Sequence, residues 1–350
     1  MPPFKQENIA MNVIPTPLDQ NRRNIQLVLA RMGLVDDGDN LIVEMLPGGV
    51  SSNVLKISTG KHTFCLKQAL PKLKVAKDWE APVDRIFGEI DWLRAVDAIV
   101  PGAVPKILGV DRATGCFAMQ FFPETVYRNW KSCLLEGEFD DGVASSLGST
   151  LGRIHAATAN REQIAKTFAN DTNFYALRLE PYLAETARSH ANLSDAILSI
   201  LERTRTTKCA LVHGDVSPKN ILVGLNGPVI LDAECAWYGD PAFDLAFCLN
   251  HFWLKSALFP DRASGYMRLF RTIADSYFAW VEWEPRAELE ARVATLLPCL
   301  TLARVDGKSP VEYLNEKQRM QVRNLAKRLI GHASTSLDAV QAAWTKGINE

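Results

Sequence analysis

Polar residues able to do chemistry gather around one short β-hairpin that the sequence predicts near residues 221–231. Two apolar runs, 221–223 and 229–231, flank Asn226-Gly227, which is a strong hairpin signal. The outer ends of this hairpin carry five polar residues: His213, Asp215 and Asn220 before it, and Asp232 and Glu234 after it. Because hairpin strands run antiparallel, we expect Asn220 and Asp232 to lie close together in space.

A carboxylate and an amide oxygen that converge beside a second carboxylate suit a hard cation such as Mg²⁺. Asn220 and Asp232 are therefore the candidate metal ligands, and Asp215 is left to accept a proton. Asp and Asn are also common turn formers, so a plain loop is the competing interpretation of each residue alone. The complete set at this spacing favours a catalytic, metal-binding site over a plain loop.

The pattern His213-x-Asp215-x-x-x-x-Asn220, followed by an Asp that ends the next strand, resembles the catalytic loop and metal motif of the protein-kinase-like fold. The sequence His-Gly-Asp-Val-Ser-Pro-Lys-Asn, with Asp-Ala-Glu later, resembles the aminoglycoside phosphotransferase and choline kinase family more than it resembles protein kinases. Members of that family phosphorylate small molecules. The similarity covers roughly residues 40–300.

The resemblance implies a role for each residue of the motif. Asp215 matches the catalytic aspartate that orients the acceptor hydroxyl and takes its proton. Asn220 and Asp232 match the ligands of Mg²⁺, which bridges the phosphates of ATP. His213 matches the histidine that braces the loop, and Asp244 matches an aspartate that holds the loop from beneath.

The motif departs from the protein-kinase pattern at two places. Ser217 stands where protein kinases have a lysine two residues after the aspartate, and whether Lys219 substitutes for it is open. Ala233-Glu234 replaces the Phe-Gly of the usual Asp-Phe-Gly, and Glu234 could reach a metal or its bound water.

The nucleotide side of the resemblance begins with a turn between two predicted strands, in the stretch Leu46–Asn53. The family often has a Gly-rich turn here, which implies that backbone N–H groups and a serine hydroxyl bind phosphate oxygens. The residues concerned are Gly48, Gly49, Ser51 and Ser52. A simple hairpin turn is the alternative.

Lys67 ends the predicted strand 63–67 and matches the lysine that binds the α and β phosphates. In a strand of alternating faces it points away from Phe64 and Leu66. Glu89 lies on the apolar face of a predicted helix, and an acid placed there needs a partner, for which Lys67 is the natural choice. Glu80 and Asp84 are the competing acids.

The stretch Met119–Pro123 resembles the family's hinge, whose backbone would bind adenine through Gln120 and Phe122. An ordinary apolar strand end is the alternative. Farther along, the chain from Trp237 is predicted to begin a helix, with Asp240 as its cap and Pro241 in its first position. The apolar stripe of this helix, Leu245, Leu249 and Phe252, should be core.

The elements that must position these residues fall into two lobes. A leading helix at 19–33 (Asp19 as its possible cap), strands at 41–45, 53–58 and 62–67, a helix at 83–97 and strands at 106–111 and 116–122 make residues 1–122 a nucleotide-binding lobe. Residues 123–350 read as helical, apart from a β island at 210–232. The fold class is α+β: a protein-kinase-like fold with a small β-rich lobe and a larger helical one.

The composition of the chain limits the kinds of partner that we expect. The 350 residues carry 39 basic and 40 acidic side chains, a net charge of −1, and no basic stripe that would indicate nucleic acid. Seven scattered cysteines without Cys-x-x-Cys predict reduced thiols. Without a signal peptide or a long apolar run, we expect no membrane partner and a cytoplasmic location.

Three further features have competing interpretations. His155 is interpreted as a packed histidine. The acidic run Glu136–Asp141 is either a solvated loop or an attractor of a cationic substrate. The segment Arg304–Pro310 interrupts two helices where the family builds its acceptor pocket, and no ligand is assigned to it.

The sequence as a whole predicts an ATP-dependent phosphotransferase that acts on a hydroxyl group of a small-molecule acceptor. A non-catalytic nucleotide-binding module on the same fold is the main alternative. A protein kinase is disfavoured because no Ala-Pro-Glu motif follows Asp232. An aminoglycoside, an amino alcohol such as choline and a sugar such as methylthioribose all stay open as acceptors, although Ala236–Gly239 with Phe243-Asp244 resembles the methylthioribose kinase version of this segment.

Overall fold

A computed structural model describes residues 21–36, 38–47, 52–70, 84–348 and 350. Contacts divide the chain into two compact units. The first contains residues 1–86 and 108–119, and the second contains residues 87–107 and 120–350. No helix among the described residues is long and apolar enough to cross a membrane.

The first unit is built on a five-stranded sheet with the strand order β1-β2-β3-β5-β4. Its strands are β1 (Ile42–Met45), β2 (Ser52–Ser58), β3 (Thr63–Ala69), β4 (Ile107–Asp111) and β5 (Cys116–Gln120). β2 pairs antiparallel with both β1 and β3. A turn at Thr59-Gly60 joins β2 and β3, and the N–H of Thr59 donates to the carbonyl of His62 across it at 2.8 Å.

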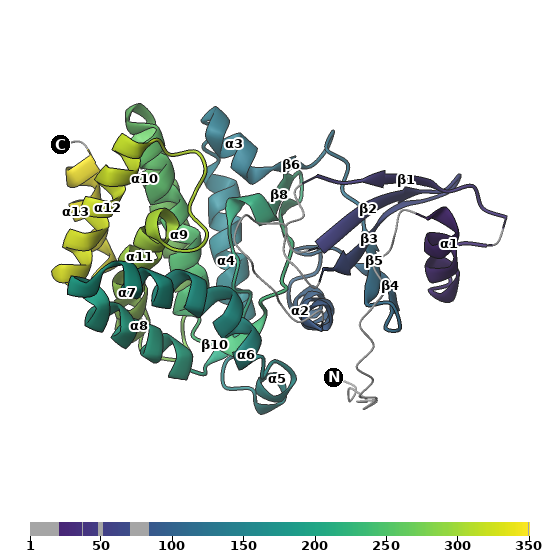
Figure 1. Cartoon of the computed structure of the whole chain (residues 1–350), viewed down its shortest axis with the longest axis horizontal. Coiled ribbons are helices and arrows are strands. Elements are labelled where there is room, and N and C mark those ends of the chain that lie inside the picture. The colour runs from purple at the N-terminus through teal and green to yellow at the C-terminus, as the bar shows by residue number, and fades with distance from the viewer. Residues whose placement is uncertain (1–20, 37, 48–51, 71–83, 349) are drawn as a thin grey trace. The chain divides into compact units, whose positions relative to one another are not determined.

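Helix α1 (Arg22–Arg31) covers one face of this sheet (Figure 1). Its apolar side forms a core with alternate residues of the strands: Ile25, Val28 and Leu29 with Leu55, Ile57, Phe64 and Leu66. The helix begins later than predicted, because the side chain of Asn21 accepts the N–H of Arg23 and acts as the N-cap. Asp19, the predicted cap, lies outside the described residues.

The second unit is mainly helical. Its longer helices are α2 (Arg85–Ile99), α4 (Asp141–Thr158), α8 (Ser194–Thr206), α9 (Ala242–Leu258), α10 (Ala263–Phe278), α11 (Arg286–Asp306), α12 (Glu316–Gly331) and α13 (Leu337–Ile348). Its shorter pieces are α3 (Trp130–Glu136), α5 (Glu162–Thr167), α6 (Asp171–Phe174), a π-helix η1 (Tyr175–Ala184), α7 (Glu185–Ser189) and the 3₁₀ turns η2 (Ala191–Leu193) and η4 (Pro260–Arg262).

Helix α9 is the centre of this unit, where it packs against α10 and α11 (Figure 1). Every residue from Ala242 to Ala257 is buried, which is typical of a helix surrounded by others. The predicted core positions Leu245, Leu249 and Phe252 are fully buried. Polar residues on this helix therefore need a partner or a function.

Short strands hold the predicted catalytic loop inside the helical unit. The predicted hairpin is present as β8 (Ile221–Gly224) and β9 (Gly227–Ile230), flanked by β6 (Arg128–Asn129). β7 (Ala210–Val212) pairs antiparallel with β10 (Trp237–Gly239).

The predicted helix is present as α9, which begins at Ala242, one residue after the predicted first position Pro241. Asp240 accepts the N–H of Ala242, as expected of the predicted cap, and Trp237–Gly239 ahead of it form β10. The pairing partner of Trp237 is Val212, which local sequence cannot reveal.

Candidate active site

The β8–β9 hairpin brings together the two residues that were predicted as metal ligands. Ile221 lies opposite Ile230, and the N–H of Leu231 donates to the carbonyl oxygen of Asn220 at 2.9 Å. Asp232 follows directly and has a left-handed backbone, with φ +68°. Few residues other than glycine adopt this conformation, and such strain is often held at functional sites.

His213 connects the start of the loop to the end of β9. Its Nδ1 accepts the N–H of Asp215 at 3.0 Å, so Nε2 carries the proton and donates to the carbonyl of Leu231, also at 3.0 Å. Trp92 of α2 packs its ring edge-on at 4.8 Å. Burial lowers the pKa of His213, which keeps the ring neutral and fixes this tautomer.

Asp244, in the first turn of α9, accepts three hydrogen bonds. The backbone N–H groups of His213 and Gly214 donate to its two oxygens at 2.7 and 2.8 Å. Nε2 of His155 lies 3.3 Å from the same carboxylate, and Nδ1 of His155 lies 2.9 Å from the Tyr277 hydroxyl. His155 is thus a fully buried, packed histidine, and Asp244 binds the loop from the side of α9.

Two features of its position require Gly214 to be a glycine: its backbone conformation and the close approach of another segment. Its φ is +81°, and a Cβ atom at this position would lie 2.9 Å from the Cβ of Cys235. A side chain here would strain the backbone and collide with the segment that follows Asp232. The loop between β7 and β8 therefore packs directly on the chain beyond β9.

Arg178 is a site residue that the sequence reasoning missed. It lies on the π-helix η1, is buried, and places its guanidinium 3.0 Å from the Asp215 carboxylate. Its Nε also donates to the carbonyl of Gly214. π-Helical turns are rare and frequently occur at functional sites. The available signal was an arginine between Leu177 and Leu179 in an apolar helical stretch.

The side chain of Lys219 points toward Asp215, since its Nζ lies 3.3 Å from the Asp215 carboxylate. Burial alone would raise the pKa of Asp215, but the Lys219 ammonium and the Arg178 guanidinium more than offset it, so this pKa lies below its ordinary value. Asp215 is therefore ionised at neutral pH and held in one place by two cations.

The chemistry of the donors around Asn220 fits a hard divalent cation. Nδ2 of Asn220 donates to the carbonyl of Asp215 at 3.1 Å, which leaves its Oδ1 as an acceptor. Oxygen donors of this kind suit Mg²⁺, which usually takes one or two protein carboxylates and completes its shell with phosphates and water. Among the described residues, no group of three His, Cys, Asp or Glu side chains forms a metal cage.

Several residues predicted for the nucleotide side are described, and each is placed within its own unit. In the first unit, Ser52 begins β2 and Lys67 lies on β3, and both are buried. Gly48, Gly49 and Ser51 lie outside the described residues. In the second unit, Phe122 packs edge-on against Tyr127 at 4.7 Å, and Gln120 donates its N–H to the carbonyl of Lys106.

Glu89 lies on α2 in the second unit and is only 2% exposed, four residues before the buried Leu93 on the same face. Of its competitors for Lys67, Asp84 is exposed and Glu80 lies outside the described residues. The pairing of Lys67 with Glu89 stays a prediction, as does the contact of Glu234 with a metal.

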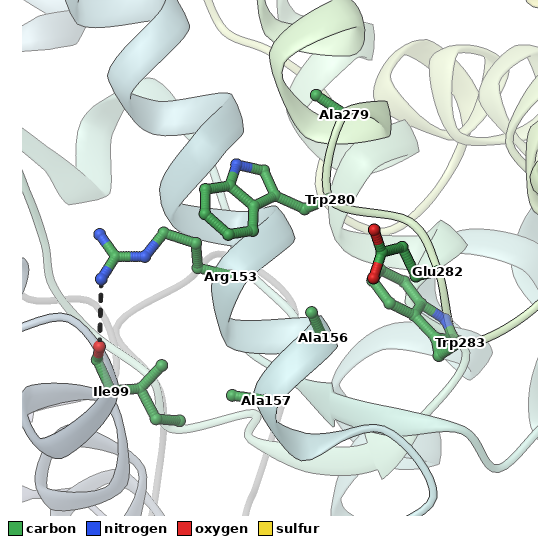
Figure 2. Close-up of a pocket in the computed structure, with 8 residues that line it drawn as sticks. All are labelled: Ile99, Arg153, Ala156, Ala157, Ala279, Trp280, Glu282 and Trp283. Atoms are coloured by element: carbon green, nitrogen blue, oxygen red, sulfur yellow. Dashed lines mark hydrogen bonds between the residues drawn. The ribbon is translucent and has the colours of Figure 1, made fainter.

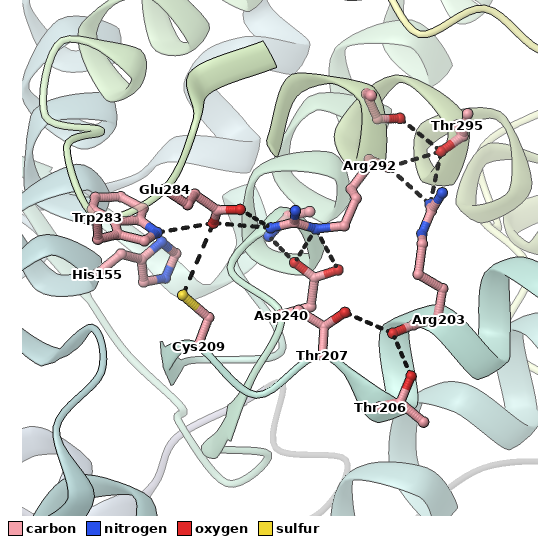
Figure 3. A network of polar contacts seen from close by, with 12 residues as sticks. His155, Arg203, Thr206, Thr207, Cys209, Asp240, Trp283, Glu284, Arg292 and Thr295 are labelled. Atoms are coloured by element: carbon pink, nitrogen blue, oxygen red, sulfur yellow. Dashed lines mark hydrogen bonds and ion pairs between the residues drawn. The ribbon is translucent and has the colours of Figure 1, made fainter. Parts of the chain in front are cut away.

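A network of polar contacts fixes the approach to α9 (Figure 3). Arg292 of α11 donates to Asp240 at 3.1 Å and pairs with Glu284 at 2.7 Å. Asp240 also accepts the N–H of Ala242, the first residue of α9. Burial raises the pKa of Asp240, and Arg292 opposes that shift. The network therefore sets where α9 begins and, with it, the position of Asp244.

A pocket of about 800 Å³ lies elsewhere on the second unit, between the ends of α4 and α10 (Figure 2). Arg153 lies across the ring of Trp280 at 5.8 Å, and its guanidinium donates to the carbonyl of Ile99 at 3.4 Å. The lining residues contain one arginine and one carboxylate, Glu282, and none of the predicted site residues. Its chemistry points to no reaction.

The acidic run 136–141 and the segment 304–310, whose roles the sequence left open, both form ion pairs and hydrogen bonds within the protein. In the acidic run, Glu136 and Glu138 pair with Arg128, and Asp140 caps α4. In the segment 304–310, Arg304 donates to the Tyr182 hydroxyl at 3.2 Å, and Lys308 pairs with Glu180 at 2.8 Å. This segment thus packs on the π-helix that carries Arg178. All seven cysteines are free.

Sequence comparisons place this site in a known context. A model of a phosphotransferase enzyme family matches residues 42–289. A methylthioribose kinase from Exiguobacterium sibiricum is 27% identical over 257 residues, which cover 66% of this chain and 64% of that protein. The chain therefore spans less than two thirds of the length of this curated relative.

Solved structures show the same fold at low sequence identity. Choline kinase from Cryptosporidium parvum Iowa II superposes with a TM-score of 0.55 at 12% identity, over 94% of this chain and all of that one. The amicoumacin kinase hAmiN, solved in complex with AMP-PNP, Ca²⁺ and Ami, gives a TM-score of 0.53 at 15% identity over 84% of this chain and 90% of that one. The predicted two-part fold, with an antiparallel sheet and a helical unit, is confirmed.

Proposed function

Since the chain belongs to this phosphotransferase enzyme family, we propose that it transfers the γ-phosphoryl group of ATP to a hydroxyl group of a small molecule. One observation carries the proposal: a buried, ionised carboxylate, Asp215, is fixed between Arg178 and Lys219 beside the oxygen donors of Asn220 and Asp232. The names of its relatives support a sugar as the first acceptor class to test.

Each side chain of the proposed site has one task. Asp215 accepts the proton of the acceptor hydroxyl as that oxygen attacks phosphorus, and Arg178 and Lys219 keep the carboxylate ionised for it. Asn220 and Asp232 would hold Mg²⁺, which neutralises charge on the nucleotide phosphates when bound. Lys67 is proposed to bind phosphate oxygens. Asp244 and His213 act by keeping the loop in place.

The alternatives are less consistent with this segment. Protein kinases place an activation segment after the metal aspartate, whereas here β10 begins at Trp237 and α9 at Ala242, in a stretch that is described throughout. A non-catalytic module has no need of an ionised carboxylate whose protonation two cations oppose.

The test is a screen of hydroxylated metabolites and antibiotics for acceptor-dependent ATP consumption, with wild-type protein and Asp215→Ala in parallel. Asp141→Ala is the matched control, because Asp141 is an exposed carboxylate of the same unit that pairs only with Arg268 among the described residues. We expect at least one acceptor to be turned over by wild type and Asp141→Ala but not by Asp215→Ala. Equal activity of all three proteins would disprove the role of Asp215.

A further inference from the structure

Four basic residues from three helices meet beyond Arg178. His251 and Lys255 lie one turn apart on α9, Arg304 comes from the end of α11, and Lys131 comes from α3. Tyr313 lies among them, with Nζ of Lys255 and Nζ of Lys131 at 5.7 and 5.9 Å from its ring centre. We call these four residues the basic cluster.

Lys255 is the unusual member of the basic cluster. It is 1% exposed, and among the described residues no carboxylate lies within ion-pair distance of its ammonium group. Burial, with the charges of Lys131 and Arg304, lowers its pKa to about 7. Cys248 and Glu312 oppose this shift, and Glu312 pairs with Lys131 at 2.8 Å. A buried ammonium without a counter-ion is costly, and proteins usually pair it.

Other polar atoms around the cluster also lack a hydrogen-bond partner within the described part of the chain. These atoms are Nε2 of His251, Nε of Arg304 and the hydroxyl of Tyr313. His251 is 93% buried, and burial followed by the charge of Lys255 lowers its pKa well below the ordinary value. Native proteins leave few such groups unsatisfied, so several of them in one place call for a partner from outside the chain.

The cluster is connected to the catalytic carboxylate through one aromatic layer. The guanidinium of Arg178, which pairs with Asp215, lies 5.8 Å from the ring of Phe247 and 5.9 Å from that of Tyr182. The ring of Phe247 contacts His251 at 5.7 Å, and Arg304 lies 5.9 Å from the ring of Tyr182.

Phe247, His251 and Lys255 are spaced four residues apart, so they follow one face of α9 over about 12 Å. This face of α9 leads from the ring that lies beside Arg178 to Lys255.

We propose that the basic cluster binds an anionic group, a carboxylate or a phosphate, on the acceptor that Asp215 deprotonates. The proposal rests on the proposed function and narrows its substrate class to hydroxylated anions. An anion would pair with Lys255 and satisfy the open donors, whereas a cationic acceptor would be repelled by the same side chains.

The first experiment compares acceptors that differ only in charge. 4-Hydroxybutyrate is paired with 4-hydroxybutyramide for the carboxylate arm, and ribose 5-phosphate is paired with ribose for the phosphate arm. We expect wild type to prefer the anion of at least one pair. Lys255→Met should lower the ratio of kcat/KM for anion over neutral partner by about tenfold. Lys317→Met, at an exposed lysine of α12, is the control.

The second experiment measures binding without catalysis, so that it is independent of the proposed function. Titration calorimetry with succinate and with inorganic phosphate at pH 8, in two buffers of different ionisation heat, counts the protons taken up on binding. Because the pKa of Lys255 is about 7, an anion beside it should draw a proton from the buffer.

The outcomes separate the two proposals. If no compound supports ATP consumption but proton uptake is present in wild type and absent in Lys255→Met, the proposed function fails and the anion site stands. If ATP is consumed with a neutral or cationic acceptor and neither anion causes uptake that depends on Lys255, the anion site is overturned. Lys255→Met is expected to fold, since it removes a buried charge and keeps most of the volume.

Discussion

The catalytic loop and the basic cluster lie a few side chains apart, yet they differ in how their polar groups are satisfied. In the loop, both ring nitrogens of His213 and both oxygens of Asp244 have partners within the protein, and Ser217 is the exception. In the basic cluster, by contrast, buried polar atoms are left open. The contrast supports the proposal that the chain builds its catalytic geometry in advance, while the proposed acceptor side is completed by a ligand.

The largest expected effect tests the loop side of this contrast. Asp215→Ala should reduce turnover about 10²–10⁴-fold, because removal of a general base has an effect of this size. The affinity for ATP should change only a few-fold, since the carboxylate is proposed to touch the acceptor. Single-turnover kinetics on an identified acceptor and nucleotide titration measure the two quantities. Near-normal turnover would remove Asp215 from the mechanism.

A second change separates metal binding from proton transfer. Asp232→Asn should weaken Mg·ATP binding and turnover together, since it removes the charge that would hold the ion while keeping the side-chain size. Calorimetry of Mg·ATP binding and a magnesium titration of the rate check this result. Unchanged affinity and unchanged magnesium dependence would assign the metal to other ligands.

The third prediction concerns the cations that hold Asp215. Arg178→Met removes one of the two positive charges that keep the pKa of this carboxylate low, so the pKa should rise. The acidic limb of the pH profile of kcat should therefore move to higher pH. Arg178→Lys keeps the charge and should move it less. A limb that stays in place for both variants would show that another group controls it.

The smallest expected effect concerns stability on the cluster side. Lys255→Met should raise the free energy of unfolding by about 1–4 kcal/mol, as replacement of buried charges by apolar groups often does. The pKa of Lys255 is about 7 in the folded protein and about 10.4 when unfolded, so the unfolded chain binds more protons between these values. The penalty is complete below pH 7 and fades toward pH 10.

Urea unfolding of wild type and Lys255→Met at pH 6.5, 8 and 9.5 measures this dependence. The difference in stability between the two proteins should shrink as the pH rises. A constant difference would mean that Lys255 is paired in the folded state, which would also weaken the case for the anion site.

The elements that depend on local pattern were predictable from the sequence. The hairpin at Asn226-Gly227, the strands of the first unit and the apolar stripe of α9 follow from turn chemistry and periodicity. The proximity of Asn220 and Asp232 follows from the hairpin alone. These features need no information from distant parts of the chain.

The remaining features depend on contacts between distant residues. β10 forms because Trp237 meets Val212, and Arg178 reaches Asp215 from a π-helix 37 residues earlier, as its salt bridge shows. The basic cluster joins positions from Lys131 to Arg304. No periodicity or motif relates these positions, so their proximity could be found only from the folded structure.

The hydrogen bonds of Asp244 also have a consequence for folding kinetics. They join residues 30, 31 and 89 positions away in the sequence: Gly214, His213 and His155. Contacts of high sequence separation require the closure of long loops, and they form slowly compared with helices. During refolding, the helical signal should therefore recover before catalytic competence, and regained activity would report the last stage of assembly.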